Sequence, residues 1–219
     1  MLVGNDVVDL RDPFSQPNVI HPHFDVRVFT RAEREKLLKS DLMMTHRHRW
    51  ALWAAKESSY KVARKLDPTV RFLPRQFVVD RFEERWAAVQ GGGGLFFVHL
   101  RQRDDWVHAV ATSYASSSRK LSAMPGRCPS GIFRWGQQVL RSAEVTLLDN
   151  ARDDPSEIVR ELARESIASG MAVASEEVKV ASSERIPRVR MRGTQLQVDL
   201  SLSHHGRYVA YAWAGPAPG

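Results

Sequence analysis

The sequence predicts an α+β fold made of two similar halves, residues 1–115 and 116–219, each an antiparallel sheet packed on a long helix. Two observations support it. In each half a helical pattern precedes several β-branched or aromatic runs, which are typical of strands. Between the halves, residues 113–131 are rich in Ser, Pro and Gly, a composition typical of a linker or a long surface loop.

Three short matches between the halves suggest that one α+β unit was duplicated and then diverged. They occur in the same order in both halves, although each is weak alone. The matched segments are 53–58 with 162–166, 77–79 with 178–180, and 107–111 with 209–213. Two unrelated α+β halves remain the alternative.

The first half carries signals for two helices. Residues 30–33 read Thr-Arg-Ala-Glu, a capping box, so a short helix should follow to about residue 40. Thr45 can cap a long helix to about residue 66, where an Asp-Pro pair ends it. A flexible turn is expected at residues 90–94. The expected strands are residues 2–10, 76–83, 95–101 and 106–113.

The second half begins with a helix signal of its own. Asp154 followed by Pro155 places Asp at the N-cap and Pro at the first helical position. Gly170 fits the position just past the end of this helix. The strands expected after it are residues 177–181, 189–192, 195–203 and 208–213.

Composition narrows the class of protein. The chain has 219 residues and a single cysteine, which excludes an internal disulfide framework. No apolar run is long enough for a membrane helix, and no secretory signal is seen, so a cytoplasmic protein is expected. The formal net charge of +7 favours an anionic partner: nucleic acid, a phosphorylated cofactor or an acidic protein.

Two carboxylates stand in apolar surroundings. Glu57 shares one face of the long helix with Trp50, Trp53 and Lys61, and burying it is costly unless a cation or donor meets it. A structural ion pair with Lys61, four residues on, is the simplest explanation. Asp6, however, interrupts an apolar strand, where aspartate is disfavoured. Two carboxylates from separate elements suit a hard cation such as Mg²⁺.

These residues lie in motifs that resemble the signature of the 4′-phosphopantetheinyl transferase superfamily. The first motif is Val3-Gly4-Asn5-Asp6, which matches Gly-x-Asp, and the second is Trp53-x-x-Lys-Glu-Ser-x-x-Lys61. The gap between them is slightly long for the family. Near the end of the chain, Ser203-His204 before a small-residue strand resembles the family's Ser-His element. Arg185-Ile-Pro-Arg188 resembles its basic-x-Pro element.

The resemblance implies an architecture. The Ser-His element follows the Gly-x-Asp strand, as in the small holo-acyl-carrier-protein synthases, and not as in the larger Sfp-like members. The small synthases are about half this length and share each site between subunits of a trimer. We therefore expect an internal pseudo-dimer that works as a monomer. It would have one active site, because Glu165, the counterpart of Glu57, follows no Gly-x-Asp strand.

The resemblance also implies the reaction. Such enzymes move 4′-phosphopantetheine from coenzyme A to a serine of an apo carrier protein and release 3′,5′-ADP. Asp6 and Glu57 would hold Mg²⁺, Lys61 would neutralise phosphate charge, and Glu57 is our first choice of general base. Asp9 is expected only to support the metal ligands. The residues expected to contact coenzyme A are Lys56, Arg185, Arg188, Ser203 and His204.

A non-catalytic basic module, binding nucleic acid or a synthase partner, is the alternative function. The joint presence of Asp6, Glu57 and Lys61 favours catalysis, because a binding module needs no such set. The expected partner is an acidic acyl or peptidyl carrier protein. The pathway, whether fatty-acid, polyketide, peptide or lysine, stays open at this stage.

Overall fold

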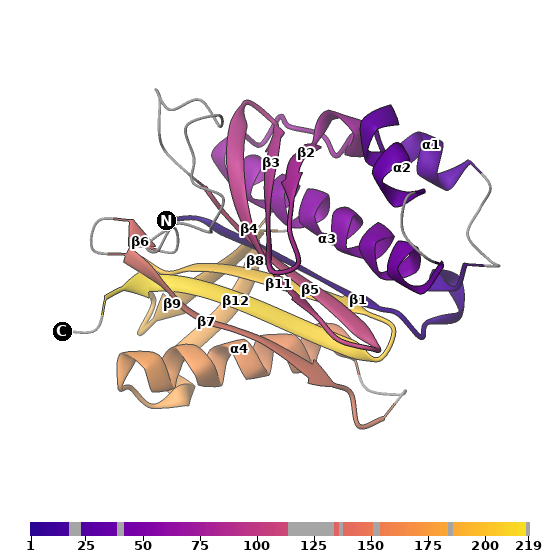
Figure 1. The fold of residues 1–219 in the computed structure, drawn as a ribbon. Coiled ribbons are helices and arrows are strands. Elements are labelled where there is room, and N and C mark those ends of the chain that lie inside the picture. Colours follow the sequence, from indigo (N-terminus) through magenta and orange to yellow (C-terminus); the bar gives the residue numbers. More distant parts are fainter. Residues whose placement is uncertain are drawn as a thin grey trace.

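The computed structural model describes residues 1–17, 23–38, 42–113, 134–135, 138–150, 154–183 and 186–217. The architecture is α+β, with antiparallel sheets between two long helices (Figure 1), which confirms the predicted fold class. The expected linker, residues 113–131, lies outside the described residues apart from Ser113.

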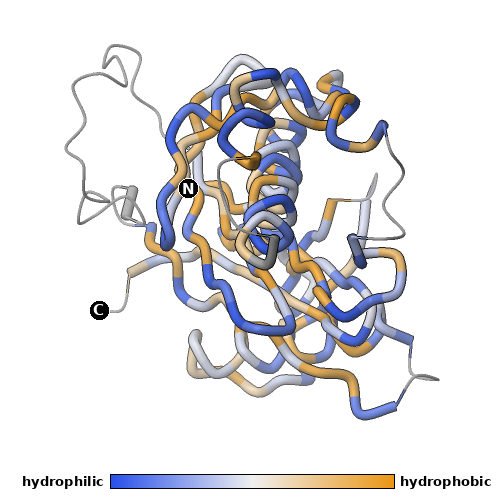
Figure 2. The backbone as a smooth tube through the Cα atoms, turned by 45° about the vertical axis from the view of Figure 1, so that its right-hand side comes forward, coloured by the Kyte–Doolittle hydropathy of each residue, from blue (hydrophilic) through white to orange (hydrophobic). Residues whose placement is uncertain are grey.

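The first sheet is antiparallel, with the strand order β1-β5-β4-β3-β2. The long helix α3 (Leu42–Leu66) packs on it through a large apolar cluster. Along α3, hydrophobic and hydrophilic residues alternate (Figure 2), as expected of a helix with one buried face. The other elements of this part are β1 Val3–Asp9, η1 Pro13–Ser15, α1 Phe24–Val28, α2 Arg31–Leu37, η2 Pro74–Gln76, β2 Val78–Phe82, β3 Trp86–Gly91, β4 Gly94–Gln102 and β5 Trp106–Ser113.

The second part has a four-stranded sheet of order β11-β12-β7-β6 and a three-stranded sheet of order β10-β9-β8. Helix α4 (Pro155–Met171) packs on them through a second apolar cluster. The remaining elements are β6 Arg134–Trp135, β7 Gln138–Leu147, η4 Ser175–Glu177, β8 Val178–Ser183, β9 Ile186–Met191, β10 Thr194–Gln195, β11 Asp199–His205 and β12 Tyr208–Pro216.

The strand orders of the two parts correspond. The run β7-β12-β11 matches β1-β5-β4, and β9 and β8 continue beyond β11 as β3 and β2 continue beyond β4. In both parts the long helix follows the first of these strands in the chain. This arrangement is compatible with two similar halves. The internal pseudo-dimer, and the boundaries 1–115 and 116–219, stay predictions.

Several local expectations need correction. The long helix begins at Leu42 rather than after a Thr45 cap, and the Thr45 hydroxyl instead donates to the Leu37 carbonyl. Helix α4 continues past Gly170, and Ala172 takes the left-handed conformation at its end, with φ 55°. Gly170 is needed for packing, because a Cβ there would lie 2.6 Å from the Trp213 ring. The sequence did not predict β3 or β7.

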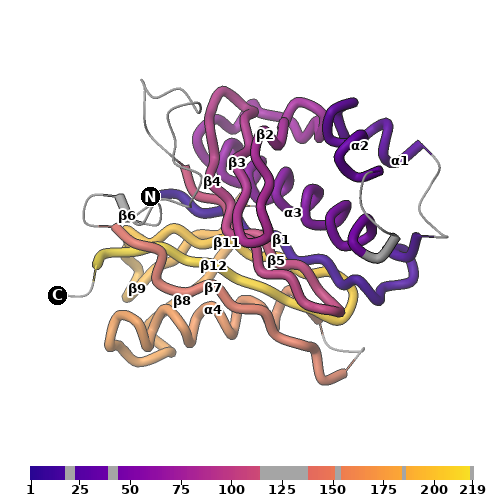
Figure 3. The backbone as a smooth tube through the Cα atoms, in the orientation of Figure 1, coloured from indigo at the N-terminus to yellow at the C-terminus, as the bar shows by residue number. Residues whose placement is uncertain are grey.

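The two parts meet where β1 runs beside β11 (Figure 3). On this edge the backbone N–H groups of β1 donate to side chains of β11 at a constant separation of 196 residues. The four donor–acceptor pairs are Val3–Asp199, Asn5–Ser201, Val7–Ser203 and Asp9–His205. The outward carbonyls of Val3 and Asn5 accept from Lys65 and Lys61. The strand edge is thus hydrogen-bonded by side chains instead of a backbone ladder.

A buried ion pair joins α2 to α3. Lys56 has no exposed surface, and its ammonium donates to both carboxylate oxygens of Glu33 at 2.9 Å and to the carbonyls of Pro74 and Phe77. Glu33 also accepts from the backbone N–H groups of Val79 and Thr30, the latter in the predicted capping box. All three ammonium protons of Lys56 are therefore used inside the fold.

Replacing Lys56 should destabilise the protein strongly. Lys56→Ala leaves the Glu33 carboxylate buried without its cation, a loss of about 3–5 kcal/mol in the free energy of unfolding. Urea denaturation measures it. The matched control is Arg31→Ala, which removes the exposed ion pair with Glu35 and should cost below about 0.5 kcal/mol. Equal costs in the two variants would contradict a structural role for Lys56.

Candidate active site

Asp6 lies on β1 at the junction of three elements. Its Oδ1 accepts from Lys61 Nζ of α3 at 3.0 Å and from Ser203 Oγ of β11 at 2.9 Å. The glycine of the Gly-x-Asp motif makes this approach possible, because a Cβ on Gly4 would lie 2.1 Å from the carbonyl oxygen of Ser58. A substitution at Gly4 would therefore push β1 away from α3 and separate Asp6 from Lys61.

Glu57 lies one helical turn before Lys61, with its Oε1 3.5 Å from the Lys61 ammonium. Burial and the nearby Asp6 charge raise the pKa of Glu57 to about 7, although Lys61 opposes the shift. Burial alone would lower the pKa of Lys61, but Asp6 and Glu57 together raise it. The site therefore holds two carboxylates but only one ammonium, that of Lys61. The single positive charge of Lys61 does not balance the two negative charges when both Asp6 and Glu57 are ionised.

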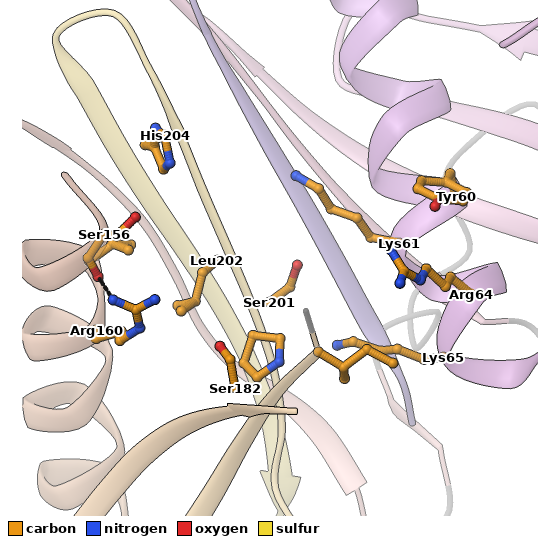
Figure 4. Close-up of a pocket in the computed structure, with 13 residues that line it drawn as sticks. Tyr60, Lys61, Arg64, Lys65, Ser156, Arg160, Ser182, Ser201, Leu202 and His204 are labelled. Carbon is orange, nitrogen blue, oxygen red and sulfur yellow. Dashed lines mark hydrogen bonds between the residues drawn. The ribbon is translucent and has the colours of Figure 1, made fainter. Parts of the chain in front are cut away.

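Two neighbouring cavities open at these residues. The smaller, of about 310 Å³, is lined by Asp6, Trp53, Glu57 and Ser203, among others. The larger, of about 590 Å³, lies between α3 and α4 (Figure 4). Lys61, Leu202 and His204 line both. The cations on the walls of the larger cavity are Lys61, Arg64, Lys65 and Arg160, and its apolar lining includes Tyr60, Val159, Ile186, Pro187 and Leu202.

The Ser-His element is placed at this junction. Ser203 Oγ accepts from the Val7 N–H at 3.2 Å and donates to Asp6, so it joins β11 to the carboxylate. His204 is exposed in both cavities. Partial burial, followed by the nearby Lys61 charge, lowers the pKa of His204. Its imidazole is therefore largely uncharged at neutral pH and offers one N–H donor.

Other expected contacts of coenzyme A do not gather here. Lys56 lies away from both cavities, with its ammonium buried against Glu33. Arg185 lies outside the described residues. Arg188 is exposed on β9 and is not among the residues that line the two cavities. Asp9 does not line them either; it binds Arg207.

Sequence reasoning missed three cations of the larger cavity, Arg64, Lys65 and Arg160. Arg64 follows Lys61 by three residues, so helical periodicity was a usable signal. Arg160 lies on α4 and reaches the cavity only through the packing of the two parts, so no local signal marks it. Lys65 also lines the cavity, but its ammonium already donates to the Val3 and Leu200 carbonyls and to Asp199.

A model of the 4′-phosphopantetheinyl transferase superfamily matches residues 2–111, half of the chain. The match covers both Asp6 and the helix with Glu57 and Lys61. The chain belongs to the 4′-phosphopantetheinyl transferase superfamily. Membership makes it a transferase and implies coenzyme A and a carrier protein as partners of this superfamily member. No curated protein matches the sequence.

Two kinds of feature were not found in the described part of the chain. Among the described residues, no group of three or more His, Cys, Asp or Glu side chains is arranged to hold a metal ion. No helix in the described part of the chain is long and apolar enough to cross a membrane.

The raised pKa of Glu57 predicts a pH-dependent stability. Between the ordinary value near 4.5 and about 7, the folded chain holds a proton that the unfolded chain has lost. The free energy of unfolding should then fall as the pH rises from 5 to 8, on the order of 2 kcal/mol from this group. Urea denaturation without divalent metal measures it. Glu57→Gln should flatten this fall, and an unchanged slope in that variant would contradict the assignment.

Proposed function

We propose that the chain transfers 4′-phosphopantetheine from coenzyme A to a serine of an apo carrier protein, in a Mg²⁺-dependent reaction that releases 3′,5′-ADP. One observation carries the proposal. Asp6, Glu57 and Lys61 converge beside Ser203 and His204, at the mouth of a cavity with cationic walls. Superfamily membership supports the class of reaction.

The donor set fits a hard divalent cation. Asp6 and Glu57 are oxygen donors that line the same small cavity, and burial together with the nearby Asp6 charge raises the pKa of Glu57, so a further cation there would stabilise its ionised form. Magnesium held by two carboxylates characteristically completes its shell with water and substrate phosphates. When bound, the cation would neutralise the charge that develops on the pyrophosphate.

The larger cavity suits the 3′,5′-ADP portion of coenzyme A. Its volume of about 590 Å³ lies in the usual range for small-molecule sites. Lys61 and His204 lie where it joins the carboxylate site, so we place the pyrophosphate there. Arg64 and Arg160 provide charge for the remaining phosphate, and the apolar lining provides a surface for the adenine. Lys65 keeps its structural hydrogen bonds in this arrangement.

Each site residue then has a defined task. Glu57 accepts the proton of the carrier serine as the serine oxygen attacks the β-phosphorus. The new Ser O–P bond forms, and the P–O bond to the bridging oxygen breaks. The electron pair leaves on 3′,5′-ADP, where Lys61 neutralises the charge. Ser203 holds Asp6 in place through its hydroxyl.

Both sides of this site come from one chain, so a monomer is sufficient for activity. The partner is an acidic acyl or peptidyl carrier protein, suited to a chain of net charge +7. The experiment is mass spectrometry of candidate apo carrier proteins incubated with the chain, coenzyme A and Mg²⁺. A gain of the phosphopantetheinyl mass supports the proposal. No gain with any carrier class would favour the non-catalytic binding module.

Removing either carboxylate should abolish transfer while the fold survives. Asp6→Asn and Glu57→Gln keep the shape of each side chain but remove its charge, so the metal loses a ligand. Lys61 keeps its ion pair with Glu57 in Asp6→Asn and its ion pair with Asp6 in Glu57→Gln, so neither change leaves this cation unpaired. The same mass-spectrometric assay measures transfer, and circular dichroism checks the fold. Glu35→Gln, an exposed site on α2, is the control. Full activity of either variant at ordinary Mg²⁺ would refute the assignment.

His204→Ala should weaken the binding or turnover of coenzyme A. The loss should be about 1.5–3 kcal/mol, the range for a hydrogen bond to a charged group. Calorimetry of coenzyme A binding measures it, and His204→Gln, which keeps an N–H donor, should retain part of the affinity. His205 does not serve as a silent control, because its Nδ1 accepts from the Asp9 N–H. Wild-type affinity in His204→Ala would overturn the phosphate-binding role.

A further inference from the structure

Asp9 is a buried carboxylate that the proposed reaction does not use. It lies three residues after Asp6 on β1 and has no exposed surface. Its Oδ1 accepts from Arg207 Nη2 at 2.7 Å and from the Arg11 N–H at 2.9 Å, and its Oδ2 accepts from Arg207 Nε at 2.8 Å and from the Arg207 N–H at 3.0 Å. Burial opposes ionisation, yet these hydrogen bonds lower the pKa of Asp9.

Arg207 lies in the two-residue turn, Gly206-Arg207, that joins β11 to β12. The turn is pressed against Asp9, because a Cβ on Gly206 would lie 2.6 Å from Asp9 Oδ2. Gly206 also has a φ of +53°, which favours glycine. Asp9 therefore binds the turn of this hairpin through a bidentate ion pair and a backbone hydrogen bond to Arg207. This geometry fixes both the distance and the orientation of the turn relative to β1.

The same hairpin carries His204. Ser203 is bonded to β1 on one side of His204, and His205 and Arg207 are bonded to Asp9 on the other. His204 itself is exposed in the cavities, and its own side chain does not set the path of the hairpin. Its position relative to Asp6 and Glu57 thus depends on contacts that come from β1. The contact nearest the tip is the one with Asp9.

We infer that the Asp9–Arg207 pair is a positioning device that holds His204 at the phosphate end of the coenzyme A cavity. The inference rests on the proposed function, because it assumes that His204 contacts coenzyme A. Asp9 and Arg207 are positioning residues, since neither lines the cavities. A side chain that binds through one donor needs its backbone held to a fraction of an ångström, and supporting contacts of this kind provide that.

The test is a double-mutant cycle on coenzyme A affinity, measured by calorimetry without carrier protein. Arg207→Gln should weaken binding about three- to tenfold in the wild-type background and by less than about twofold in the His204→Ala background. Arg207→Lys, which keeps the charge but not the fork, should fall between Arg207→Gln and wild type. Thermal denaturation first shows that each variant is folded at the temperature of measurement.

Arg192→Gln is the matched control. Arg192 also lies in a two-residue hairpin turn and pairs with a carboxylate, Glu177, at 2.7 Å, but its hairpin joins β9 to β10 and does not carry His204. This variant should leave coenzyme A affinity unchanged. Equal losses for Arg207→Gln in both backgrounds, or no loss in either, would overturn the inference, because the pair would then act independently of His204.

A ligand-free readout separates this inference from the proposed function. The imidazole ¹H–¹³C signal of His204, identified by its absence in His204→Ala, should shift in Arg207→Gln and in Asp9→Asn but not in Arg192→Gln. If His204→Ala binds coenzyme A as wild type does, the proposed role of His204 fails, while the signal still reports on positioning. If the His204 signal does not move in either Arg207→Gln or Asp9→Asn, that result alone refutes the positioning role.

Discussion

The outer edge of β1 is the constraint on which the rest of the structure depends. A strand edge with unpaired N–H and C=O groups is costly when buried, so every such group needs a partner. Here the partners are side chains of β11 and two lysines of α3 rather than the backbone of another strand. The contacts recur at every second residue of β1, and they fix the positions of the first sheet, of β11 and of α3 relative to one another.

The candidate site lies along this edge of β1. Odd-numbered residues of β11 bond to β1, and the even-numbered Leu202 and His204 line the larger cavity, together with the odd-numbered Ser201. Because even-numbered Asp6 turns toward α3, its carboxylate meets Lys61. Ser203 belongs to both networks, since it accepts from the Val7 N–H and donates to Asp6. A shift of β11 by one residue would exchange these faces and remove His204 from the site.

Local signals in the sequence predicted much of the fold. The capping box at Thr30, the Asp154 N-cap and the extent of β5 agree with the structure, because each depends on neighbouring residues. Strand β3 was missed, since its Ala-Ala pair is a weak strand signal. The grouping of Asp6, Glu57 and Lys61 was predicted from two carboxylates in apolar surroundings and from the resemblance of their motifs to the superfamily signature. Arg160 and the Asp9–Arg207 pair, 198 residues apart, depend on tertiary packing.

Helical geometry explains why the two lysines of the second motif have different roles. Lys61 follows Glu57 by four residues, which places the two on one face, whereas Lys56 lies five residues before Lys61, about 140° around the helix. One lysine therefore enters the apolar interior, where Glu33 must meet it, and the other enters the junction with β1. The single helix α3 thus anchors α2 on one side and supplies the cation of the site on the other.

The charges of the site are also ordered in space. Asp6 and Glu57 line the smaller cavity and give its wall negative charge, while Arg64 and Arg160 line the larger one and give its wall positive charge. Lys61 stands between them, bonded to Asp6 yet 3.5 Å from Glu57. A ligand that brings a divalent cation at one end and phosphates along its length complements the carboxylates of the smaller cavity and the cations of the larger one. Such a ligand can enter in only one direction, because reversing it would set phosphate against carboxylate.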